Sequence, residues 1–255
     1  MSLVVKEGLP ATQTPLPVQE QCCLWRCISA LCQTIYDVAL KVIQAIGRCF
    51  SSQSPQDSTK DQRVALSSRT HLETGISTVK DSKNLIPFYR DQEKNIAGVT
   101  LKDILNWDDT RLESQHDYIQ WLFPLAVQSA YNGNAPILDQ SMIKIFRGDK
   151  SLQNRVLDSL HRMLAFYGLE QNAETQEITR ASNFTERFKG GWLTPGNHNF
   201  LRITRIITSL GLLGLSNHAT AFFTIMKDIA QKEGVEIVSS TSLLCWTNAN
   251  NANMK

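Results

Sequence analysis

One stripe of polar residues has the types and spacing needed to bind an anionic ligand. His198, Arg202, Arg205 and Ser209 recur at helical intervals, so they share one face of an expected helix. Two arginines one turn apart near a helix N-terminus can hold a carboxylate or phosphate through paired N–H donors, aided by the helix dipole. His198, Arg202 and Arg205 are therefore candidate ligand- or partner-binding residues.

The same arginines also have a purely structural interpretation. They could pair with Asp117 or Glu113 and cap the carbonyl groups of a neighbouring helix, which would satisfy their charges inside the fold. An enzyme would instead need Arg202 or Arg205 to face His116 across a cavity, with a nucleophile between them. We rank that alternative lowest and expect no catalytic residue.

His116 and Asp117 are adjacent, so on a helix their side chains point about 100° apart and do not form an acid–base pair. We expect Asp117 to close a capping box with Ser114 at a helix start, and we keep His116 and Asp117 as candidate ligand contacts. His161 and His218 have no partner at metal-ligand spacing, and no glycine-rich phosphate loop is found. The sequence therefore predicts no metal and no cofactor.

The most unusual segment runs from Tyr118 to Pro124 and is crowded with aromatic residues. On a helix stopped by Pro124, apolar side chains would cover more than half of the surface. We expect this helix to lie deep in a core, with Tyr118, Trp121, Phe123 and Pro124 as a structural signature. Its polar groups must then find partners inside the protein.

Further motifs follow in order along the chain: Asn84–Arg90, Tyr118–Pro124, Leu164–Gly168, Asn199–Ile207 and Ser209–Leu215. Together they resemble the opioid growth factor receptor conserved region over roughly residues 84 to 230. The resemblance implies a non-enzymatic domain, named for membrane-associated receptors that bind a short enkephalin-type peptide. It thus implies a peptide or protein ligand, opioid-type by resemblance only. Residues 125–133 depart from the family pattern.

Composition sets the scale of the fold and excludes one class of partner. With 255 residues, 42% of them hydrophobic, the chain can bury one substantial core and carry appendages. The formal net charge is only +2, and no basic run with interleaved aromatic residues occurs. Nucleic acid is therefore not an expected partner.

The N-terminal part suggests how the protein is located in the cell. Residues 1–20 lack the apolar core of a secretory signal peptide, and the apolar segment 21–50 is interrupted by charges too often for a spanning helix. We expect a cytoplasmic protein or one bound peripherally to a membrane. Delivery of the protein into a host cell is a further hypothesis about its location.

Five of the six cysteines fall within 21–50, on an expected amphipathic helix. One hypothesis is a membrane-surface helix, with Cys22, Cys23 and Cys27 as acylation sites. The other is a helix that packs on the main domain or self-associates, which would make the protein an oligomerisation scaffold. The sequence leaves both open.

The expected organisation has five parts. A flexible tail (1–20), the cysteine-rich helix (21–50) and a polar linker (51–82) precede a helical domain (83–234) and a C-terminal tail (235–255). Within the domain we expect helices from Pro136, from Leu152 to a stop at Gly168, from Asn197, and from Asn217. Strand-like alternation occurs at 235–238, with a second candidate at 243–246. The predicted fold is all-α, with five or six helices around one core.

Overall fold

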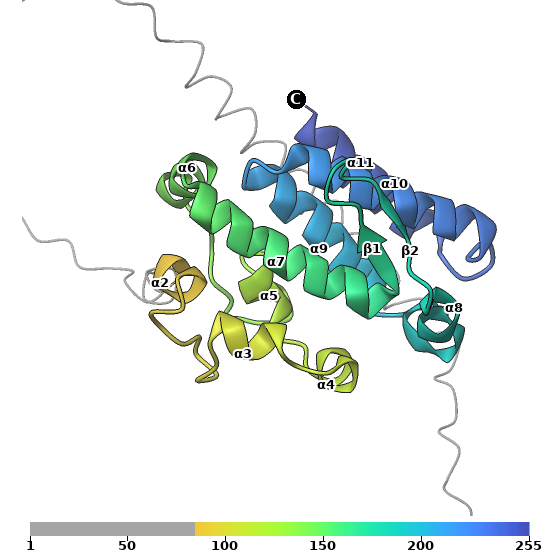
Figure 1. The fold of residues 1–255 in the computed structure, drawn as a ribbon, viewed down its shortest axis with the longest axis horizontal. Helices are drawn as coiled ribbons and strands as arrows, with labels where there is room; N and C mark the ends of the chain where they lie inside the picture. The colour runs from red at the N-terminus through yellow and green to blue at the C-terminus, as the bar shows by residue number, and fades with distance from the viewer. Residues whose placement is uncertain (1–84, 255) are drawn as a thin grey trace, which may run out of the picture.

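The computed structural model of the protein describes residues 85–254 (Figure 1). The parts predicted at 1–20, 21–50 and 51–82 lie outside the described residues, and so do Cys22, Cys23 and Cys27. None of the helices from 85 to 254 has the length and hydropathy needed to cross a bilayer.

The described residues form a mostly helical fold, which confirms the all-α class, but they contain ten helices rather than the five or six predicted, because several short helices formed by a few residues have no clear periodic pattern. A two-stranded antiparallel sheet accompanies the helices, with Leu169 of β1 opposite Arg180 of β2. The elements are α2 (Leu85–Tyr89), α3 (Leu101–Leu105), α4 (Asp109–Ser114), α5 (Ile119–Leu122), α6 (Gln140–Gly148), α7 (Lys150–Tyr167), β1 (Leu169–Gln171), β2 (Ile178–Arg180), α8 (Phe184–Arg187), the π-helical turn η2 (Phe188–Trp192), α9 (Asn199–Leu212), α10 (Ser216–Lys232) and α11 (Ser240–Asn253).

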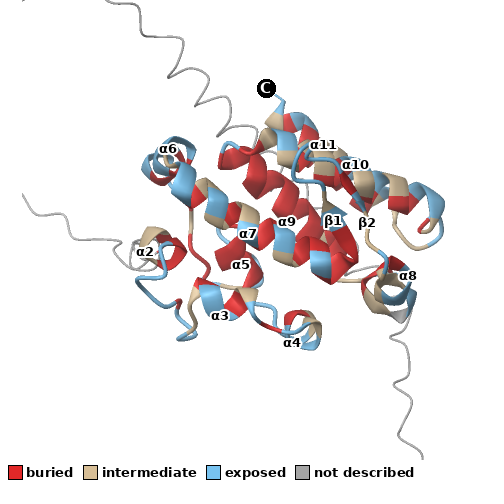
Figure 2. Ribbon diagram, viewed as in Figure 1, coloured by how far each residue is buried: buried red, intermediate tan, exposed pale blue. Residues whose placement is uncertain are grey.

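Helix α9 is the centre of the fold. Figure 2 shows it buried along most of its length, and Figure 1 shows α10 and α11 beside it. Its apolar residues Ile203, Ile206, Ile207 and Leu210 are fully buried. A helix that is apolar on most of its surface is stable only when other elements cover it, which is the role of α10 and α11.

Helix α7 begins and ends where local signals place it. Asp149 caps its first turn by accepting hydrogen bonds from the backbone of Ser151 and Leu152. It ends at Gly168, which has a φ of +75°, so the predicted left-handed stop is confirmed. A Cβ atom at Gly168 would lie 2.8 Å from the Cα of Phe184, so glycine also allows α8 to approach.

The aromatic signature lies in the core, as predicted. Tyr118, Leu122 and Phe123 are fully buried, and the Trp121 side chain is only 2% exposed. The Trp121 ring lies 5.0 Å from the ring of Phe88 in α2, measured between centroids. This contact connects α5 to α2.

The predicted capping box of Ser114 and Asp117 is wrong. Ser114 is the last residue of α4, whereas α5 starts at Ile119 and has no side-chain cap. The backbone between them is extended at Gln115, and Asp117 is exposed. The helix expected from Pro136 also begins later, at Gln140, because Asp139 supplies the N-cap.

The predicted C-terminal tail is also wrong, because residues 240–253 form α11. Ser239 caps this helix, and Trp246 is 1% exposed with its indole N–H donated to the Phe200 carbonyl at 3.0 Å. The expected strands at 235–238 and 243–246 are absent from the described residues, while β1 and β2 were not predicted. Burial of Trp246 against α9 outweighs the weak local preference for a strand.

Candidate functional site

The polar stripe of α9 faces the signature segment rather than solvent. The Arg202 side chain is 5% exposed, and its guanidinium donates to the carbonyl oxygens of Leu112 at 3.0 Å and Gln115 at 2.7 Å. These carbonyls belong to the C-terminal end of α4, where no further helical turn can satisfy them. Arg202 therefore caps α4 from a neighbouring helix.

The charge of Arg202 is partly balanced by its surroundings. Its Nη1 lies 3.8 Å from a carboxylate oxygen of Glu113, and its guanidinium carbon lies 5.3 Å from the centre of the Tyr118 ring. Burial raises the pKa of Tyr118 to about 12, and the nearby positive charge of Arg202 opposes this shift. Asp117, the other acid considered from sequence, does not pair with Arg202.

Arg205 and Ser209 continue the same pattern along α9. Arg205 donates to the carbonyl oxygen of Phe123 at 3.1 Å, and the Ser209 hydroxyl donates to that of Pro124 at 2.9 Å. Burial lowers the pKa of the Arg205 guanidinium to about 10. The stripe therefore supplies internal partners for the backbone carbonyls at the end of the signature segment, whereas the buried Gln120 Oε1 has no hydrogen-bond partner within residues 85–254.

His116 and His198 form the exposed rim of this cluster. Their rings are perpendicular with centres 4.9 Å apart, and His198 Nε2 lies 3.5 Å from a Glu113 carboxylate oxygen. Partial burial and the charge of Arg202 lower the pKa of His198, although Glu113 acts in the opposite direction. His116 Nδ1 is 3.3 Å from Arg202 Nη2, so the two groups touch directly and leave no space for a nucleophile between them.

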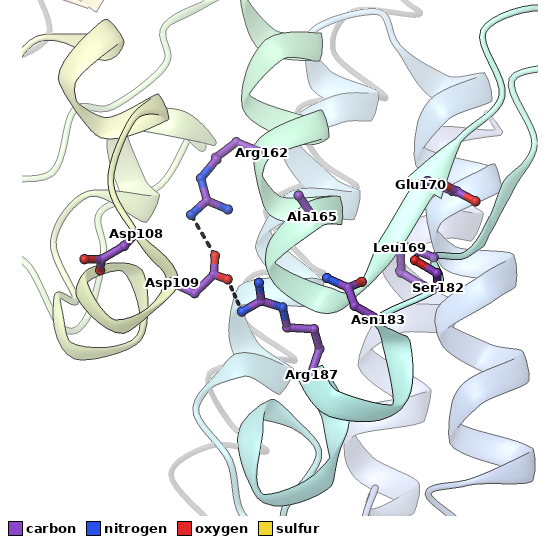
Figure 3. A pocket seen from close by; sticks show the side chains of 10 residues that line it. Asp108, Asp109, Arg162, Ala165, Leu169, Glu170, Ser182, Asn183 and Arg187 are labelled. Carbon is purple, nitrogen blue, oxygen red and sulfur yellow. Dashed lines mark hydrogen bonds and ion pairs between the residues drawn. The ribbon is translucent and has the colours of Figure 1, made fainter.

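A pocket of about 630 Å³ lies on another side of α4 and was not predicted from the sequence (Figure 3). It lies where α4, α7, β1 and the start of α8 meet. The lining residues are Asp108, Asp109, Arg162, Ala165, Leu169, Glu170, Ala181, Ser182, Asn183 and Arg187.

A shared carboxylate organises one end of this pocket. Asp109 accepts from Arg162 Nη2 at 2.7 Å and also pairs with Arg187, so two guanidinium groups converge on one acid. Arg162 further donates to the Trp107 carbonyl oxygen at 2.6 Å. These contacts hold the N-terminal end of α4 against α7 and α8.

No spacing rule could have identified this site. Arg162 and Arg187 lie on different helices, and Asp109 reaches them only because the chain folds back. The only local signal is the pair Asp108-Asp109, which is also typical of a helix start, and Asp108 does cap α4. Among the residues that the structure describes, no three His, Cys, Asp or Glu side chains are grouped to hold a metal ion.

Comparisons with known proteins converge on one family. The family model described as the opioid growth factor receptor conserved region matches residues 77–250. The opioid growth factor receptor of Homo sapiens is 39% identical over 142 residues, which cover 54% of this chain and 20% of that protein. Opioid growth factor receptor-like protein 1 of Mus musculus is 41% identical over 142 residues, covering 54% of this chain and 29% of that protein.

The corresponding receptor-like protein of Xenopus tropicalis is 42% identical over 137 residues, covering 52% of this chain and 25% of that protein. The matched segment thus spans less than a third of each of these relatives. No solved structure matches the chain.

Proposed function

Because this chain belongs to the opioid growth factor receptor conserved-region family, we propose that its helical domain is a non-catalytic module that binds a peptide or a protein. Its relatives are named as receptors or receptor-like proteins. An opioid-type peptide is the first ligand to test, since those relatives carry opioid growth factor in their names. Because only part of each relative is matched, the ligand of this chain is a proposal.

The observation that carries this proposal is the pocket beside α4. Its volume of about 630 Å³ lies within the range of about 300–1,000 Å³ typical of small-ligand sites. That space suits a few residues of an extended peptide. Exposed Ala165 lies within it, flanked by groups that can donate and accept hydrogen bonds.

A larger partner would also contact the rim formed by His116 and His198. Asp109 borders the pocket and Glu113 borders this rim. The two residues are four positions apart on α4, so the pocket and the rim are separated by about 6 Å along the helix axis. We therefore propose His116, Asp117 and His198 as outer contacts. Arg202 and Arg205 would act from inside, by holding the backbone that carries these contacts.

The test is to fill the pocket without touching the core. Ala165→Trp places a large side chain at an exposed pocket position, and Ser151→Trp adds the same side chain at an exposed site elsewhere on α7. Binding of a fluorescent enkephalin-type peptide, and of a displayed peptide library, is measured on the full chain by anisotropy and by selection. We expect Ala165→Trp to weaken binding at least tenfold, whereas Ser151→Trp leaves it unchanged.

Equal binding by both variants would show that the pocket is not used, and absence of any binding peptide would remove the proposal. Circular dichroism of each variant verifies that its helices are intact.

Membrane attachment is the second part of the proposed function. It is supported by the sequence of 21–50, where an amphipathic pattern coincides with Cys22, Cys23 and Cys27. A weak surface helix and an acyl chain together would give stable attachment, whereas either alone is marginal. Self-association of the same helix is the competing function.

A further inference from the structure

We propose that Arg162, Arg187 and Asn183 form an oxyanion subsite in the pocket, and that it takes a carboxylate of the bound peptide. This inference rests on the proposed function, because it names the chemical group by which a peptide would be held. The carboxylate has two possible sources, a peptide C-terminus and an Asp or Glu side chain.

The first observation is that two arginines share a single acid. Asp109 pairs with one terminal nitrogen of each, namely Nη2 of Arg162 and Nη1 of Arg187. Within residues 85–254, the second terminal nitrogen of each arginine has no hydrogen-bond partner. Two positive charges against one negative charge leave this end of the pocket with one positive charge in excess.

The second observation is that the spare donors converge. Figure 3 shows the remaining guanidinium nitrogens of Arg162 and Arg187 facing the space between α7 and α8. The Asn183 side chain reaches toward the same space, and its amide makes no hydrogen bond with the residues that the structure describes. Three N–H donors from two helices thus surround a volume that the protein itself does not fill.

The third observation selects a carboxylate rather than a phosphate. The other two acids on the pocket wall keep their negative charges but lie away from this end: Asp108 is directed away from Asp109 and caps the backbone of Arg111, and Glu170 points away on the far side (Figure 3). A carboxylate would neutralise the single excess charge. A doubly charged phosphate would bring a second negative charge close to Asp109, which costs energy at short range.

Each arginine has one free terminal nitrogen, so the two arginines together can donate one charged N–H bond to each oxygen of a carboxylate. Exposed Ala165 lies between the forks and β1, where a small or apolar ligand residue would rest. The structure thus favours a short acidic segment with a small or apolar residue next to its carboxylate.

The experiment follows the Nε–Hε signals of Arg162 and Arg187 in the nitrogen-15-labelled full chain by NMR, assigned through arginine-to-lysine variants. The protein is titrated with acetate, with inorganic phosphate and with uncharged acetamide, at constant ionic strength. We expect acetate to shift both signals saturably and acetamide to leave them unchanged. Phosphate should bind no more tightly than acetate.

Three small peptides then identify the source of the carboxylate. Acetyl-Gly-Ala-Leu is used with a free C-terminus and with an amidated one, and acetyl-Gly-Glu-Leu is used with an amidated one. If only acetyl-Gly-Ala-Leu with a free C-terminus binds, the subsite takes a peptide C-terminus. If the amidated acetyl-Gly-Glu-Leu binds, the subsite takes an acidic side chain.

Arg187→Gln should weaken acetate and acidic-peptide binding about tenfold or more, because one charged hydrogen-bonding group is lost. Arg90→Gln is the matched control, since Arg90 also pairs with one aspartate, Asp149, but lies outside the pocket. Circular dichroism and the backbone NMR spectrum verify that both variants are folded.

Four results would overturn the inference. Two come from the titrations: acetate causes no saturable shift, or phosphate binds more tightly than acetate. The others are that Arg187→Gln does not weaken binding, and that acetate binds whereas none of the three peptides does. If all peptides bind equally, and Ala165→Trp abolishes this binding, the proposed function stands and the carboxylate subsite is rejected. If acetate binds and no peptide does, the peptide-binding function fails as well.

Discussion

The Arg202 guanidinium donates to the Gln115 carbonyl oxygen at 2.7 Å, joining the central helix α9 to the end of α4. The same guanidinium reaches Leu112 and lies against the Tyr118 ring. One side chain therefore sets where α4 stops and where the buried signature begins. The face of α4 that borders the pocket depends on this internal support.

Replacing Arg202 and Arg205 with glutamine should destabilise the domain. The variant loses charged hydrogen bonds to the Leu112, Gln115 and Phe123 carbonyls, each worth about 1.5–3 kcal/mol when buried. We expect the free energy of unfolding in urea to fall by about 3 kcal/mol or more. Arg90→Gln, at an exposed ion pair, should change it by less than about 1 kcal/mol. Unchanged stability with lost ligand binding would instead identify the two arginines as ligand contacts.

Trp121→Ala should unfold or severely loosen the domain. The side chain is 2% exposed and contacts Phe88, and truncation of a buried aromatic residue costs about 3–5 kcal/mol. Thermal unfolding followed by circular dichroism measures the effect. Tyr131→Ala, at a tyrosine that is 67% exposed, should stay within about 0.5 kcal/mol. A soluble Trp121→Ala variant with an unchanged melting temperature would show that this residue does not support the core.

Gly168→Ala should destabilise the protein, although the substitution adds only one methyl group. The backbone φ of +75° disfavours any Cβ atom by about 1–2 kcal/mol, and the new atom would also meet the Phe184 backbone. Gly148→Ala is the matched control, because a Cβ atom there would have no heavy atom within 4 Å and the φ of Gly148 is not positive. Chemical denaturation of both variants makes the comparison. Equal stabilities would contradict the assigned role of Gly168 in ending α7.

Stability should decrease as the solution becomes mildly acidic. The pKa of His198 is lowered by burial and by Arg202, and that of His218 is lowered mainly by burial. A histidine with a lowered pKa binds fewer protons in the folded chain than in the unfolded chain, so protons favour unfolding below the ordinary value of 6.5. Its stabilising contribution is complete above that value and is lost as the pH falls toward the folded-state pKa.

Urea unfolding between about pH 7.5 and 5 measures this loss, above the range where ordinary carboxyl groups titrate. His198→Gln combined with His218→Gln should flatten the profile. If the free energy of unfolding of this variant depends on pH as steeply as that of the unmodified protein, the pH dependence belongs to other groups.

Residues 21–50, outside the described part of the chain, should bring the protein to a membrane surface. Fractionation of eukaryotic cells compares the full chain, a variant with the five N-terminal cysteines changed to serine, and a truncation that starts at residue 51. We expect membrane association to decrease in that order, because acylation and the amphipathic face act together. If all three stay in the soluble fraction and only the truncation changes in size, the helix is an oligomerisation arm.

Local patterns determined much of what could be predicted about this protein. The spacing of apolar residues in α7, the glycine that ends it, and the aromatic density from Tyr118 to Pro124 depend on neighbours in sequence. Helical periodicity and capping act over a few residues, so they can be read from the chain alone. The ordered motifs likewise pointed to the family, and the family model confirmed it.

Contacts between distant residues decided the rest. Helix α11 forms because Trp246 is buried against Phe200, and α4 ends where Arg202 meets its carbonyl groups. The pocket exists because Asp109 meets arginines of α7 and α8, which no sequence interval relates. Such contacts depend on how helices pack, and packing is a property of the whole core rather than of any one segment.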